Sequence, residues 1–561
     1  MPSSELSLDF SCLGDGSSLS SSLYESSPPS SVASDVNDIN CDLESYYMEE
    51  VDQLWRTQQV KNSGEKRHDG LSVKYVRAFL KFTLLSCRRI VWSALFHACG
   101  MREFLVVLLF EIGSVSILFV LLIWCLLASA PAFQSVYSRF SAQYCKALSL
   151  TNAAYPDMFE ELEDSVRESA INALNQSVSQ QHYPSAERRF NLDVAKLLLQ
   201  CSAIMYERYR ADEEVHIEVP DARLNPRYPA LPNPLVPGAL GLSFKTETRT
   251  AAISRFANAH GLEYSTVSEL NSQGEAFCGL FWSERGNFII LAYRGTAPTD
   301  FVEWSTDLSY ELREGGTLIR GWDRVHKGFS EKAFPDHMPE GSRSPYDSIK
   351  LSVKTLAMHL LSNRLPGTKI NVWTTGHSLG AAVASLMFSR QITEPLDFGD
   401  EIKFRDAYLF GMPVICNSLS KIAFDHSMKI DRHRTLWRIT NGSDIVSTGV
   451  PHTGDQPDSK VAPCSPLSFA HLGTSINLGQ PGVSSDSCTS SSTEPILLVS
   501  AAATTGKQKP TSSTRARAAW IAFAARLPIL GRFYSHGTAS YWLRLKELRP
   551  GAIKAGRLPK S

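Results

Sequence analysis

Residues 369–390 read KINVWTTGHSLGAAVASLMFSR, and this stretch decides the fold. Residues 370–375 are rich in β-branched and aromatic side chains, which predicts a buried strand. The residues after the second glycine combine small side chains and good helix formers with apolar positions at helical spacing, which predicts a helix. No loop separates the two elements, so Ser378 must lie in a tight turn whose neighbours Gly376 and Gly380 have no Cβ atom. Such a turn is typical of a nucleophile elbow, where the serine side chain projects from the carboxyl end of a sheet.

The composition of the whole chain narrows the possible functions. The chain has 561 residues and a formal net charge of −1, so it lacks the basic surface of a nucleic-acid-binding protein. Its first part is rich in Ser and in acidic residues, and the first basic residue is Arg56. We expect residues 1–70 to be disordered, because they offer too little apolar surface to form a core.

Residues 104–130, FLVVLLFEIGSVSILFVLLIWCLLASA, are long and apolar enough to cross a bilayer. They predict a single transmembrane helix, and a buried core helix is the alternative. Glu111 is the one charged residue in this stretch. A span over residues 112–130 would leave that carboxylate at the membrane edge, where it costs little free energy.

The charges before this stretch predict its orientation. They are Lys74, Arg77, Lys81, Arg88, Arg89 and Arg102. The bias places the amino end in the cytoplasm and the rest of the chain in the lumen or outside the cell, as in a single-pass protein of the secretory system. Residues 71–103 are a basic juxtamembrane segment. For its residues 71–99 two interpretations stay open, a segment lying on anionic lipid and a second buried helix.

The remaining chain divides by pattern. Residues 131–190 are polar and partly helical, and we expect them to form a stalk. Residues 191–552 alternate strands with helices, which predicts an α/β sheet. Within them, residues 275–296 predict two strands joined by a tight turn. Residues 481–515 are of low complexity and predict a surface insertion.

An activated serine needs a base and an acid that orients the base. In the fold with this elbow the chain order is Ser, acid, His. Asp444 follows a predicted strand at residues 435–440, so its carboxylate should lie on the same edge of the sheet as Ser378. The alternative is that Asp444 only forms a turn.

Three histidines follow Asp444 in the chain and are candidates for the base. His452 is too close to Asp444 along the loop to come from the next strand end. His471 lies on a predicted strand and is the second choice, because a histidine there is more often structural. His536 precedes the last amphipathic helix and is the predicted base.

The oxyanion hole needs backbone N–H groups aimed at the developing charge. One should come from Leu379, the residue after the nucleophile. The other should come from Thr296 at the end of the strand IILAYRGT, and the Thr296 hydroxyl could donate as well.

Several motifs in this order resemble the class 3, fungal-type lipases. They are AYRGT, VHKGF at residues 325–329, TTGHSLG, RITNGSDIV and SHGTASYW. The resemblance covers about residues 240–545 and implies an α/β-hydrolase fold. It matches Ser378, Asp444 and His536 to the catalytic triad, and Thr296 and Leu379 to the oxyanion hole. The stretch after Thr296 matches the lid, where Phe301 and Trp304 are candidates for contact with lipid.

The resemblance implies hydrolysis of acyl-glycerol esters by a membrane-anchored serine lipase, with a lipid substrate, a bilayer as partner and no metal or cofactor. A phospholipase A1 or a carboxylesterase would use the same site. A lipase-like membrane protein that binds without turnover is the alternative of another class. For the lid candidates Phe301 and Trp304, the alternative to lipid contact is that their side chains pack on the rest of the protein.

Six cysteines follow the apolar stretch, namely Cys145, Cys201, Cys278, Cys416, Cys464 and Cys488. In a lumenal domain some could pair, and their spacing resembles no metal site. Asn175 and Asn441 begin glycosylation sequons. We expect a glycan on Asn175 only, because a glycan on Asn441 would disturb Asp444.

Overall fold

The computed structural model describes residues 71–96, 101–176, 188–208, 244–267, 278–309, 311–336, 338, 343–430, 434–442, 444–450, 452, 455, 468–479, 488–490, 495–502, 511–527 and 530–555. The chain divides into two compact units, Met1–Lys66 and Arg67–Ser561, and every described residue belongs to the second. The segment 1–70, for which we predict disorder, lies outside the described residues.

The helices are α2 (Leu71–Phe96), α3 (Met101–Ala128), α4 (Pro131–Tyr144), α5 (Asp164–Asn175), α6 (Leu192–Ile204), α7 (Phe244–Ala259), α8 (Phe301–Asp307), α9 (Lys327–Ala333), α10 (Pro345–Ser362), α11 (Leu379–Thr393), α12 (Ser418–Ile430), α13 (Ile445–Thr448), α14 (Ser512–Ala524), α15 (Leu530–His536) and α16 (Thr538–Glu547). Short 3-10 helices are η1 (Pro156–Phe159), η3 (Met205–Glu207) and η4 (Pro395–Asp397).

The strands are β1 (Arg188–Asn191), β2 (Glu263–Val267), β3 (Cys278–Trp282), β4 (Phe288–Tyr293), β5 (Leu312–Glu314), β6 (Arg324–His326), β7 (Ile370–His377), β8 (Ile402–Phe410), β9 (Cys416–Asn417), β10 (Leu436–Thr440), β11 (Phe469–Ala470), β12 (Thr474–Asn477), β13 (Thr489–Ser490), β14 (Ile496–Val499) and β15 (Gly551–Ala555).

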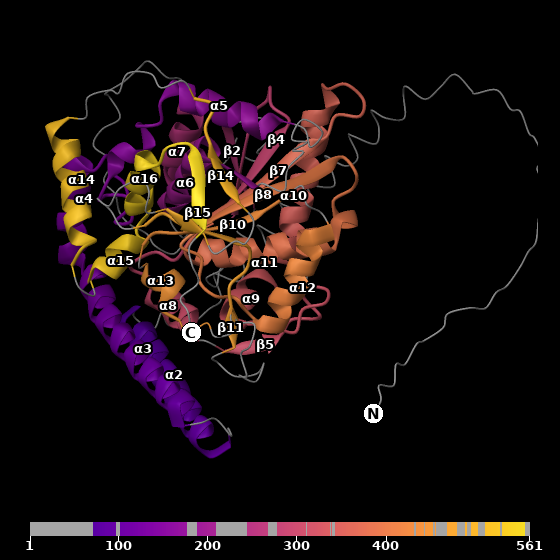
Figure 1. Ribbon diagram of the computed structural model, residues 1–561. Helices are drawn as coiled ribbons and strands as arrows, with labels where there is room; N and C mark the ends of the chain where they lie inside the picture. Colours follow the sequence, from indigo (N-terminus) through magenta and orange to yellow (C-terminus); the bar gives the residue numbers. More distant parts are fainter. Residues whose placement is uncertain are drawn as a thin grey trace, which may run out of the picture. The chain divides into compact units, whose positions relative to one another are not determined.

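Eleven of these strands form one sheet, in the order β1-β14-β15-β13-β12-β10-β8-β7-β4-β3-β2 (Figure 1). At its centre β4, β7, β8, β10 and β12 run parallel. Beyond β4 the sheet continues with β3, which is antiparallel to β4, and with β2, which is antiparallel to β3. The carboxyl ends of parallel strands meet at one edge of a sheet. The loops that follow β4, β7, β8 and β10 therefore lie close together. A second, smaller sheet has the order β11-β9-β6-β5.

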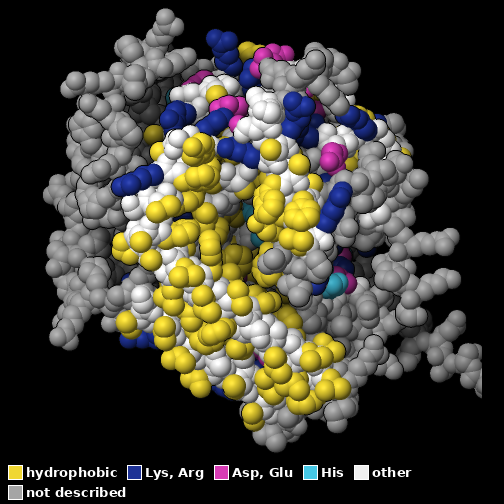
Figure 2. All heavy atoms as spheres, turned by 90° about the vertical axis from the view of Figure 1, so that its left-hand side faces the viewer, with side chains coloured by type: hydrophobic (Ala, Val, Ile, Leu, Met, Phe, Trp, Pro, Cys, Tyr) yellow, Lys and Arg dark blue, Asp and Glu magenta, His cyan; other side chains and the backbone are white. Residues whose placement is uncertain are grey.

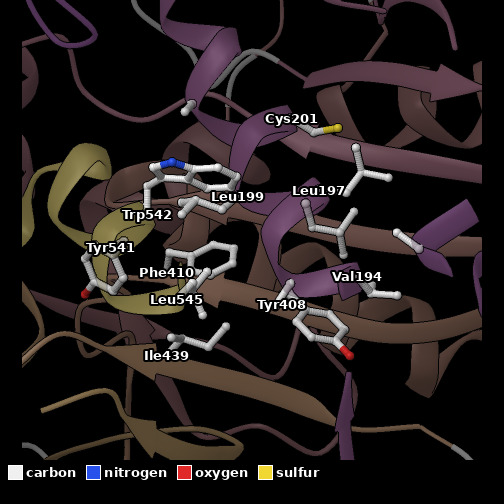
Figure 3. Close-up of a cluster of buried hydrophobic side chains, with 14 of the residues drawn as sticks. Val194, Leu197, Leu199, Cys201, Tyr408, Phe410, Ile439, Tyr541, Trp542 and Leu545 are labelled. Atoms are coloured by element: carbon white, nitrogen blue, oxygen red, sulfur yellow. The ribbon is translucent and has the colours of Figure 1, made fainter. Parts of the chain in front are cut away.

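Two buried helices cover opposite faces of β7. Every residue of β7 is buried, and successive side chains of a strand point to opposite faces. Val372 packs in the cluster that contains the side chains of α11, and Trp373 packs in the cluster that contains those of α6. Figure 3 shows the second cluster, in which α6 and α16 pack over β8. This packing fixes β7, and with it the turn into α11.

The predicted spanning segment is helix α3, which packs against α2 and α8. Tyr75 and Phe82 of α2, Leu122 and Cys125 of α3, and Phe301 of α8 share one buried cluster. The sequence allows two interpretations of residues 71–99, a segment lying on anionic lipid or a second buried helix. The structure shows a second helix, α2, packed against α3 and α8. Among the described residues α3 is the one helix long and apolar enough to cross a membrane, judged by length and composition alone.

Glu111 forms an internal ion pair. Its side chain is 1% exposed and lies 2.8 Å from Nε of Arg89 on α2. The Arg89 guanidinium also donates to the carbonyl oxygen of Ser309, just beyond α8. The carboxylate is thus satisfied inside the protein, in contrast to the position at a membrane edge that we expected.

The predicted stalk is wrong for the described residues between 155 and 190. Tyr155, Met158, Ala170, Leu174 and Phe190 are buried in the cluster that contains α6. These apolar side chains alternate with polar ones along the chain. The average composition of the segment is therefore polar, although its apolar side chains pack on the sheet.

The predicted surface insertion at 481–515 also differs from the structure in its described parts. Residues 489–490 and 496–499 form β13 and β14 of the large sheet, and α14 begins at Ser512. The described cysteines of the catalytic region, Cys145, Cys201, Cys278, Cys416 and Cys488, are all free thiols, and Cys464 lies outside the described residues.

Candidate active site

The turn between β7 and α11 has the geometry of a nucleophile elbow. Ser378 has φ 59° and ψ −128°, a strained conformation for a residue with a side chain. A Cβ atom on Gly376 would lie 2.5 Å from the carbonyl oxygen of Gly380. One on Gly380 would lie 2.4 Å from the carbonyl oxygen of Tyr293 on β4. Gly376 is therefore required by the turn itself, and Gly380 is required by the close approach of β4.

The structure brings the three predicted triad residues together. Nε2 of His536 lies 2.8 Å from Oγ of Ser378, and Nδ1 of His536 lies 3.0 Å from both carboxylate oxygens of Asp444. Asp444 follows β10 and caps α13, and His536 ends α15. A hydroxyl, an imidazole and a carboxylate in this order can pass a proton from the hydroxyl to the imidazole.

The Asp444 carboxylate is fully buried and held by several donors. Its Oδ1 accepts a hydrogen bond from the backbone N–H of Val446 at 2.8 Å, and its Oδ2 accepts one from the hydroxyl of Tyr541 at 2.6 Å. Burial alone would raise the pKa of Asp444, but His536, Tyr541 and the Val446 amide together lower it to about 2. The carboxylate is thus ionised at neutral pH and holds the His536 ring in place.

The end of α15, which carries His536, is fixed by two side chains. Nδ2 of Asn441 donates to the carbonyl oxygen of Ser535 at 2.9 Å and to Oγ of Ser540 at 2.8 Å. Nε2 of His377, beside the nucleophile, lies 2.7 Å from the carbonyl oxygen of His536. The elbow and the base are therefore connected through the backbone as well as through the Ser378 hydroxyl.

The tautomer of His377 follows from its two partners. Nε2 must donate, because its partner is a carbonyl oxygen, and Nδ1 then accepts from the hydroxyl of Tyr206 at 2.8 Å. Burial, and next the neighbouring His536, lower the pKa of His377 to about 3, so the ring is neutral. A neutral His377 adds no positive charge that would oppose protonation of the base.

Gly411, at the end of β8, makes room for the triad. Its φ is 61°, and a Cβ atom there would lie 2.9 Å from Cε1 of His536 and 3.1 Å from Oδ2 of Asp444. Glycine tolerates both the positive φ and the close approach. The contact joins β8 to residues far along the chain, so no local sequence signal could have identified Gly411.

The predicted oxyanion-hole residues lie beside the elbow. Leu379 is the first residue of α11, so its N–H has no acceptor within that helix. The backbone before Thr296 touches the elbow, because a Cβ atom on Gly295 would lie 2.5 Å from the carbonyl oxygen of His377. The Thr296 hydroxyl, the second possible donor of this residue, donates to Oδ2 of Asp307 at 2.5 Å.

Asp307 links the oxyanion region to helix α8. It ends this helix, and burial, opposed by Lys332 and Thr296, raises its pKa to about 7. The two predicted lid residues of α8 pack inside the protein. Phe301 is fully buried with its ring centroid 5.7 Å from that of Tyr75, and Trp304 lies half-buried beside the same cluster. Packing on the protein is thus the arrangement observed for both.

The second candidate for the base lies elsewhere. Nδ1 of His471 lies 2.6 Å from Oδ2 of Asp455, and its Nε2 lies 3.1 Å from the carbonyl oxygen of Ser447. Burial, followed by Arg438, lowers the pKa of His471 to about 4. With both ring nitrogens in contact with other groups, His471 supports the loop after Asp444.

One group of side chains has the spacing of metal ligands. Ligand atoms of His452, Asp455 and His471 lie within 4.8 Å of one another. Asp455 is already paired with His471 and, at 3.2 Å, with Nζ of Lys421. These contacts explain why the side chains lie close together: they form a polar cluster in which Asp455 is paired with Lys421 and His471.

The central part of the site has known relatives. Residues 290–453 match the family model described as lipase (class 3). This segment belongs to the class 3 lipase family. Ser378, Asp444, Thr296 and Leu379 lie inside the segment, and His536 lies beyond its end. The parallel sheet and the elbow agree with the α/β-hydrolase fold of these lipases.

Solved lipase structures are similar to part of the chain. The Lip2 lipase from Yarrowia lipolytica is 18% identical and covers 40% of this chain and 69% of its own, with a TM-score of 0.28. The lipase from Rhizopus microsporus var. chinensis is 18% identical, with 40% and 64% covered and a TM-score of 0.27. Lipase II from Rhizopus niveus is 17% identical, with 42% and 72% covered and a TM-score of 0.28. A search of curated protein sequences finds no match.

Proposed function

We propose that the chain is a serine lipase that hydrolyses acyl-glycerol esters through Ser378, His536 and Asp444. The observation that carries the proposal is the position of His536. Its two ring nitrogens contact the Ser378 hydroxyl and the Asp444 carboxylate at 2.8 and 3.0 Å. The class 3 lipase segment supports the same reaction class.

In the acylation step His536 accepts the proton of the Ser378 hydroxyl through Nε2, and the serine oxygen attacks the ester carbonyl. The developing oxyanion is held by the backbone N–H groups of Leu379 and Thr296. The imidazolium then donates its proton to the leaving glycerol oxygen. Asp444 keeps Nδ1 protonated and stabilises the charge on the ring.

In the deacylation step the same groups act on water. His536 takes a proton from a water molecule, and the resulting hydroxide attacks the acyl-serine carbonyl. Collapse of the second oxyanion returns the proton to Ser378 and releases a fatty acid. Both steps of this reaction use side chains and backbone groups of the chain itself.

The substrate is a triacylglycerol or a diacylglycerol. A phospholipase A1 or a carboxylesterase would use the same triad and differ only in the groups that contact the acyl chain and head group. A lipase-like protein that binds lipid without turnover is disfavoured, since all three triad side chains are present at hydrogen-bonding distance.

We also propose that the enzyme is held at a membrane by the apolar helix α3. Its length and composition support this role. The excess of Lys and Arg before residue 104 supports a cytoplasmic amino end and, for a helix that crosses completely, a lumenal or extracellular lipase domain.

The experiment is a substrate panel on the purified full chain and on Ser378→Ala. Triolein, diolein, phosphatidylcholine and p-nitrophenyl butyrate are offered, and released fatty acid or nitrophenol is measured. We expect wild type to be most active on one of the two glycerides, with Ser378→Ala inactive on all four. Highest activity on phosphatidylcholine would favour the phospholipase, and highest activity on the short ester would favour the carboxylesterase. No turnover by a folded wild type would refute the proposed reaction.

A further inference from the structure

The exposed surface of helices α2, α3, α4, α14 and α15 is unusually apolar. Figure 2 shows it as a face on which yellow side chains gather, with a hollow between the helices. Leu84 on α2, Leu109 on α3 and Val136 on α4 are each exposed by about 70%. Isolated exposed apolar residues need no explanation, but a contiguous patch marks a surface that binds something apolar.

Helix α3 has an inner and an outer face. Its buried positions recur three or four residues apart and face α2 and α8, namely Val107, Glu111, Ser114, Leu118, Leu122 and Cys125. Its exposed apolar positions lie on the opposite side of the helix, among them Leu105, Leu109, Ile112, Phe119, Ile123 and Leu127. The inner face carries the buried polar groups Glu111 and Ser114, and the outer face is apolar except for Ser116, whose hydroxyl donates to the carbonyl oxygen of Ile112.

Helix α2 adds a basic stripe next to an apolar one. Its exposed apolar residues Val73, Val76, Leu80, Leu84 and Val91 share one side of the helix. The exposed cations Lys74, Arg77, Lys81 and Arg88 recur at helical spacing on the adjoining side. An apolar stripe bordered by Lys and Arg is typical of a helix that lies in the plane of a membrane surface.

Helices α4, α14 and α15 continue the face toward the catalytic site. The rings of Trp124 on α3 and Phe133 on α4 lie 5.9 Å apart, and Arg517 of α14 donates to the carbonyl oxygen of Tyr144 at the end of α4. Trp520 on α14 is 57% exposed. The short helix α15, which ends in His536, carries further exposed aromatic rings at 533 and 534.

The contacts of α3 leave too little free helix to cross a bilayer. Phe110 packs beside the Val450 and Phe469 cluster, and Sγ of Cys125 contacts the carbonyl oxygen of Pro298. At 1.5 Å per residue, about 22 Å of the helix between these residues lies against the lipase domain. Only residues 101–109 extend beyond it, whereas a crossing needs about 20 residues. The cations on the exposed side of α2 oppose a second crossing by that helix.

We propose that this face docks on an anionic bilayer and that α3 lies in one leaflet instead of crossing it. The apolar stripes of α2 and α3 enter the boundary between head groups and acyl chains, and the basic stripe contacts the anionic head groups. The amino end and the lipase domain then lie on the same side of the membrane, which replaces the lumenal placement predicted from the charge bias.

Docking on the membrane does not depend on the proposed lipase function. Only its consequence for catalysis, that the triad lies next to its substrate, rests on that function. Because α15 carries both exposed aromatic rings and His536, docking brings the triad next to the lipid that holds the substrate. Docking itself does not require turnover, so it is measured in the Ser378→Ala background. A failure of docking and a failure of catalysis are then seen in separate measurements.

The first test is flotation of the full chain with vesicles of phosphatidylcholine, alone or with about 30 mol% phosphatidylserine. The Ser378→Ala protein is compared with a variant that also has Lys74→Gln, Arg77→Gln, Lys81→Gln and Arg88→Gln. The matched control has four exposed cations outside the face replaced, Arg285→Gln, Lys354→Gln, Lys369→Gln and Lys403→Gln.

We expect the basic-stripe variant to lose on the order of 10²-fold or more of its partitioning onto anionic vesicles, because each cation near the surface contributes about fivefold. The control should partition as the parent does. The same two sets of substitutions are also made in the protein that keeps Ser378. There both variants should hydrolyse p-nitrophenyl butyrate at the wild-type rate, which shows that they fold. Equal partitioning of the two variants, or equal binding to neutral and anionic vesicles, would overturn the proposal.

The second test separates docking from crossing. The full chain carries different epitope tags at its two ends and is synthesised with sealed microsomes, and protease is then added. Docking in one leaflet predicts that both tags share one fate, both digested or both protected. Protection of one tag and loss of the other means that α3 crosses completely, and the proposal is then wrong.

Discussion

Tyr541 donates its hydroxyl hydrogen bond to Oδ2 of Asp444 at 2.6 Å, inside the core beneath the triad. Tyr541 is on α16, directly after the loop with His536, and it is fully buried. The carboxylate oxygen that lies 3.0 Å from Nδ1 of His536 therefore has a second donor in the Tyr541 hydroxyl. Burial, and next the neighbouring Asp444, raise the pKa of Tyr541 far above its usual value, so the phenol keeps this proton.

Tyr541→Phe should lower kcat roughly tenfold with little change in KM, because one charge-assisted hydrogen bond to Asp444 is lost. The variant keeps the ring that packs in the core. Tyr346→Phe is the matched control, because this buried tyrosine of α10 donates to the carboxylate of Asp397 and not to a triad residue, and it should keep the wild-type kcat. Initial rates on the preferred glyceride give both constants. A Tyr541→Phe enzyme with wild-type kcat would show that the hydroxyl does not position Asp444.

The same variant should change the acid stability of the fold. The folded pKa of Asp444, about 2, lies below its ordinary value of 3.8. Its ionisation thus stabilises the fold above about pH 4, by about 2 kcal/mol, and this contribution is lost as the pH falls toward 2. Tyr541→Phe raises that pKa, so its free energy of unfolding should fall less between pH 5 and pH 3 than that of wild type. Urea unfolding at the two pH values measures the difference.

Ser378→Ala and His536→Ala should each reduce turnover by on the order of 10⁶-fold, because the triad acts as a unit. His471→Ala should reduce stability more than turnover, since it removes the contacts with Asp455 and the carbonyl of Ser447. Hydrolysis rates and melting temperatures are compared for the three proteins. A well-folded His471→Ala enzyme without activity would mean that the base has been assigned to the wrong histidine.

Much of this site could be predicted because its signals are local or follow chain order. The strand, the two glycines and the helix around Ser378 lie in one stretch of sequence. Asp444 follows a strand with a clear β pattern, and His536 follows from the required order of the three groups. Thr296 and Leu379, the candidates for the oxyanion hole, follow from their positions at a strand end and after Ser378.

What could not be predicted depends on contacts between distant segments. Tyr541 and Gly411 act through atoms that only the folded sheet brings near the triad. The apolar run of α3 was interpreted from length and hydropathy, which do not reveal that Glu111 finds Arg89 or that Cys125 meets Pro298. A membrane helix and a helix packed on one side have nearly the same composition.

Gly411→Ala should abolish most of the activity at a moderate loss of stability. A methyl group at this position would enter the space of His536 and Asp444, and about 1 Å of displacement can lower the rate on the order of 10²-fold. Gly261→Ala is the matched control, because its φ is 68° and nothing lies within 4 Å of the added Cβ atom. Both variants should lose about 1–2 kcal/mol from the left-handed backbone.

Only Gly411→Ala should lose turnover in this comparison. Chemical unfolding and initial rates are measured on both proteins. If Gly261→Ala loses as much activity as Gly411→Ala, backbone strain alone explains the result, and the contact with the triad does not matter.

Asp307→Asn should remove a pH dependence of stability. Burial raises the folded pKa of Asp307 to about 7, above the 3.8 of an ordinary carboxyl. The folded state therefore binds a proton that the unfolded state has released, and stability falls as the pH rises from about 4 to 7, by ~4 kcal/mol at most. The Asn side chain cannot ionise but can still accept from the Thr296 hydroxyl.

The free energy of unfolding at pH 5 and pH 8 tests this prediction. Asp307→Asn should gain stability relative to wild type at pH 8 and much less at pH 5. The exposed Asp400→Asn is the control for removal of a carboxylate at the surface. An Asp307→Asn protein that follows the wild-type pH profile would show that Asp307 is not the group responsible.

Asn441 should stay free of glycan even when the chain is directed into the secretory pathway. Its side chain is fully buried, and both amide hydrogens are used, toward Ser535 and Ser540. A glycan would replace one of these hydrogens and would have to leave a packed loop beside Asp444. Asn175 is only partly buried at the end of α5, and its Nδ2 donates to the carbonyl oxygen of Ile171 at 3.0 Å. The other hydrogen of that amide is the one a glycan would replace, so Asn175 is the site where we expect modification.

The measurement is mass spectrometry of peptides after glycosidase treatment in heavy water, which labels each former glycan site with heavy oxygen. We expect the label at Asn175 and its absence at Asn441. Because Asn441 precedes Gly442, slow spontaneous deamidation can add the same label, so a sample incubated without the glycosidase serves as the control. Glycosidase-dependent label at Asn441 in active enzyme would mean that this loop faces solvent. The contacts of Asn441 with the His536 loop would then not exist in the working enzyme, and Asp444 would not be the acid of the triad.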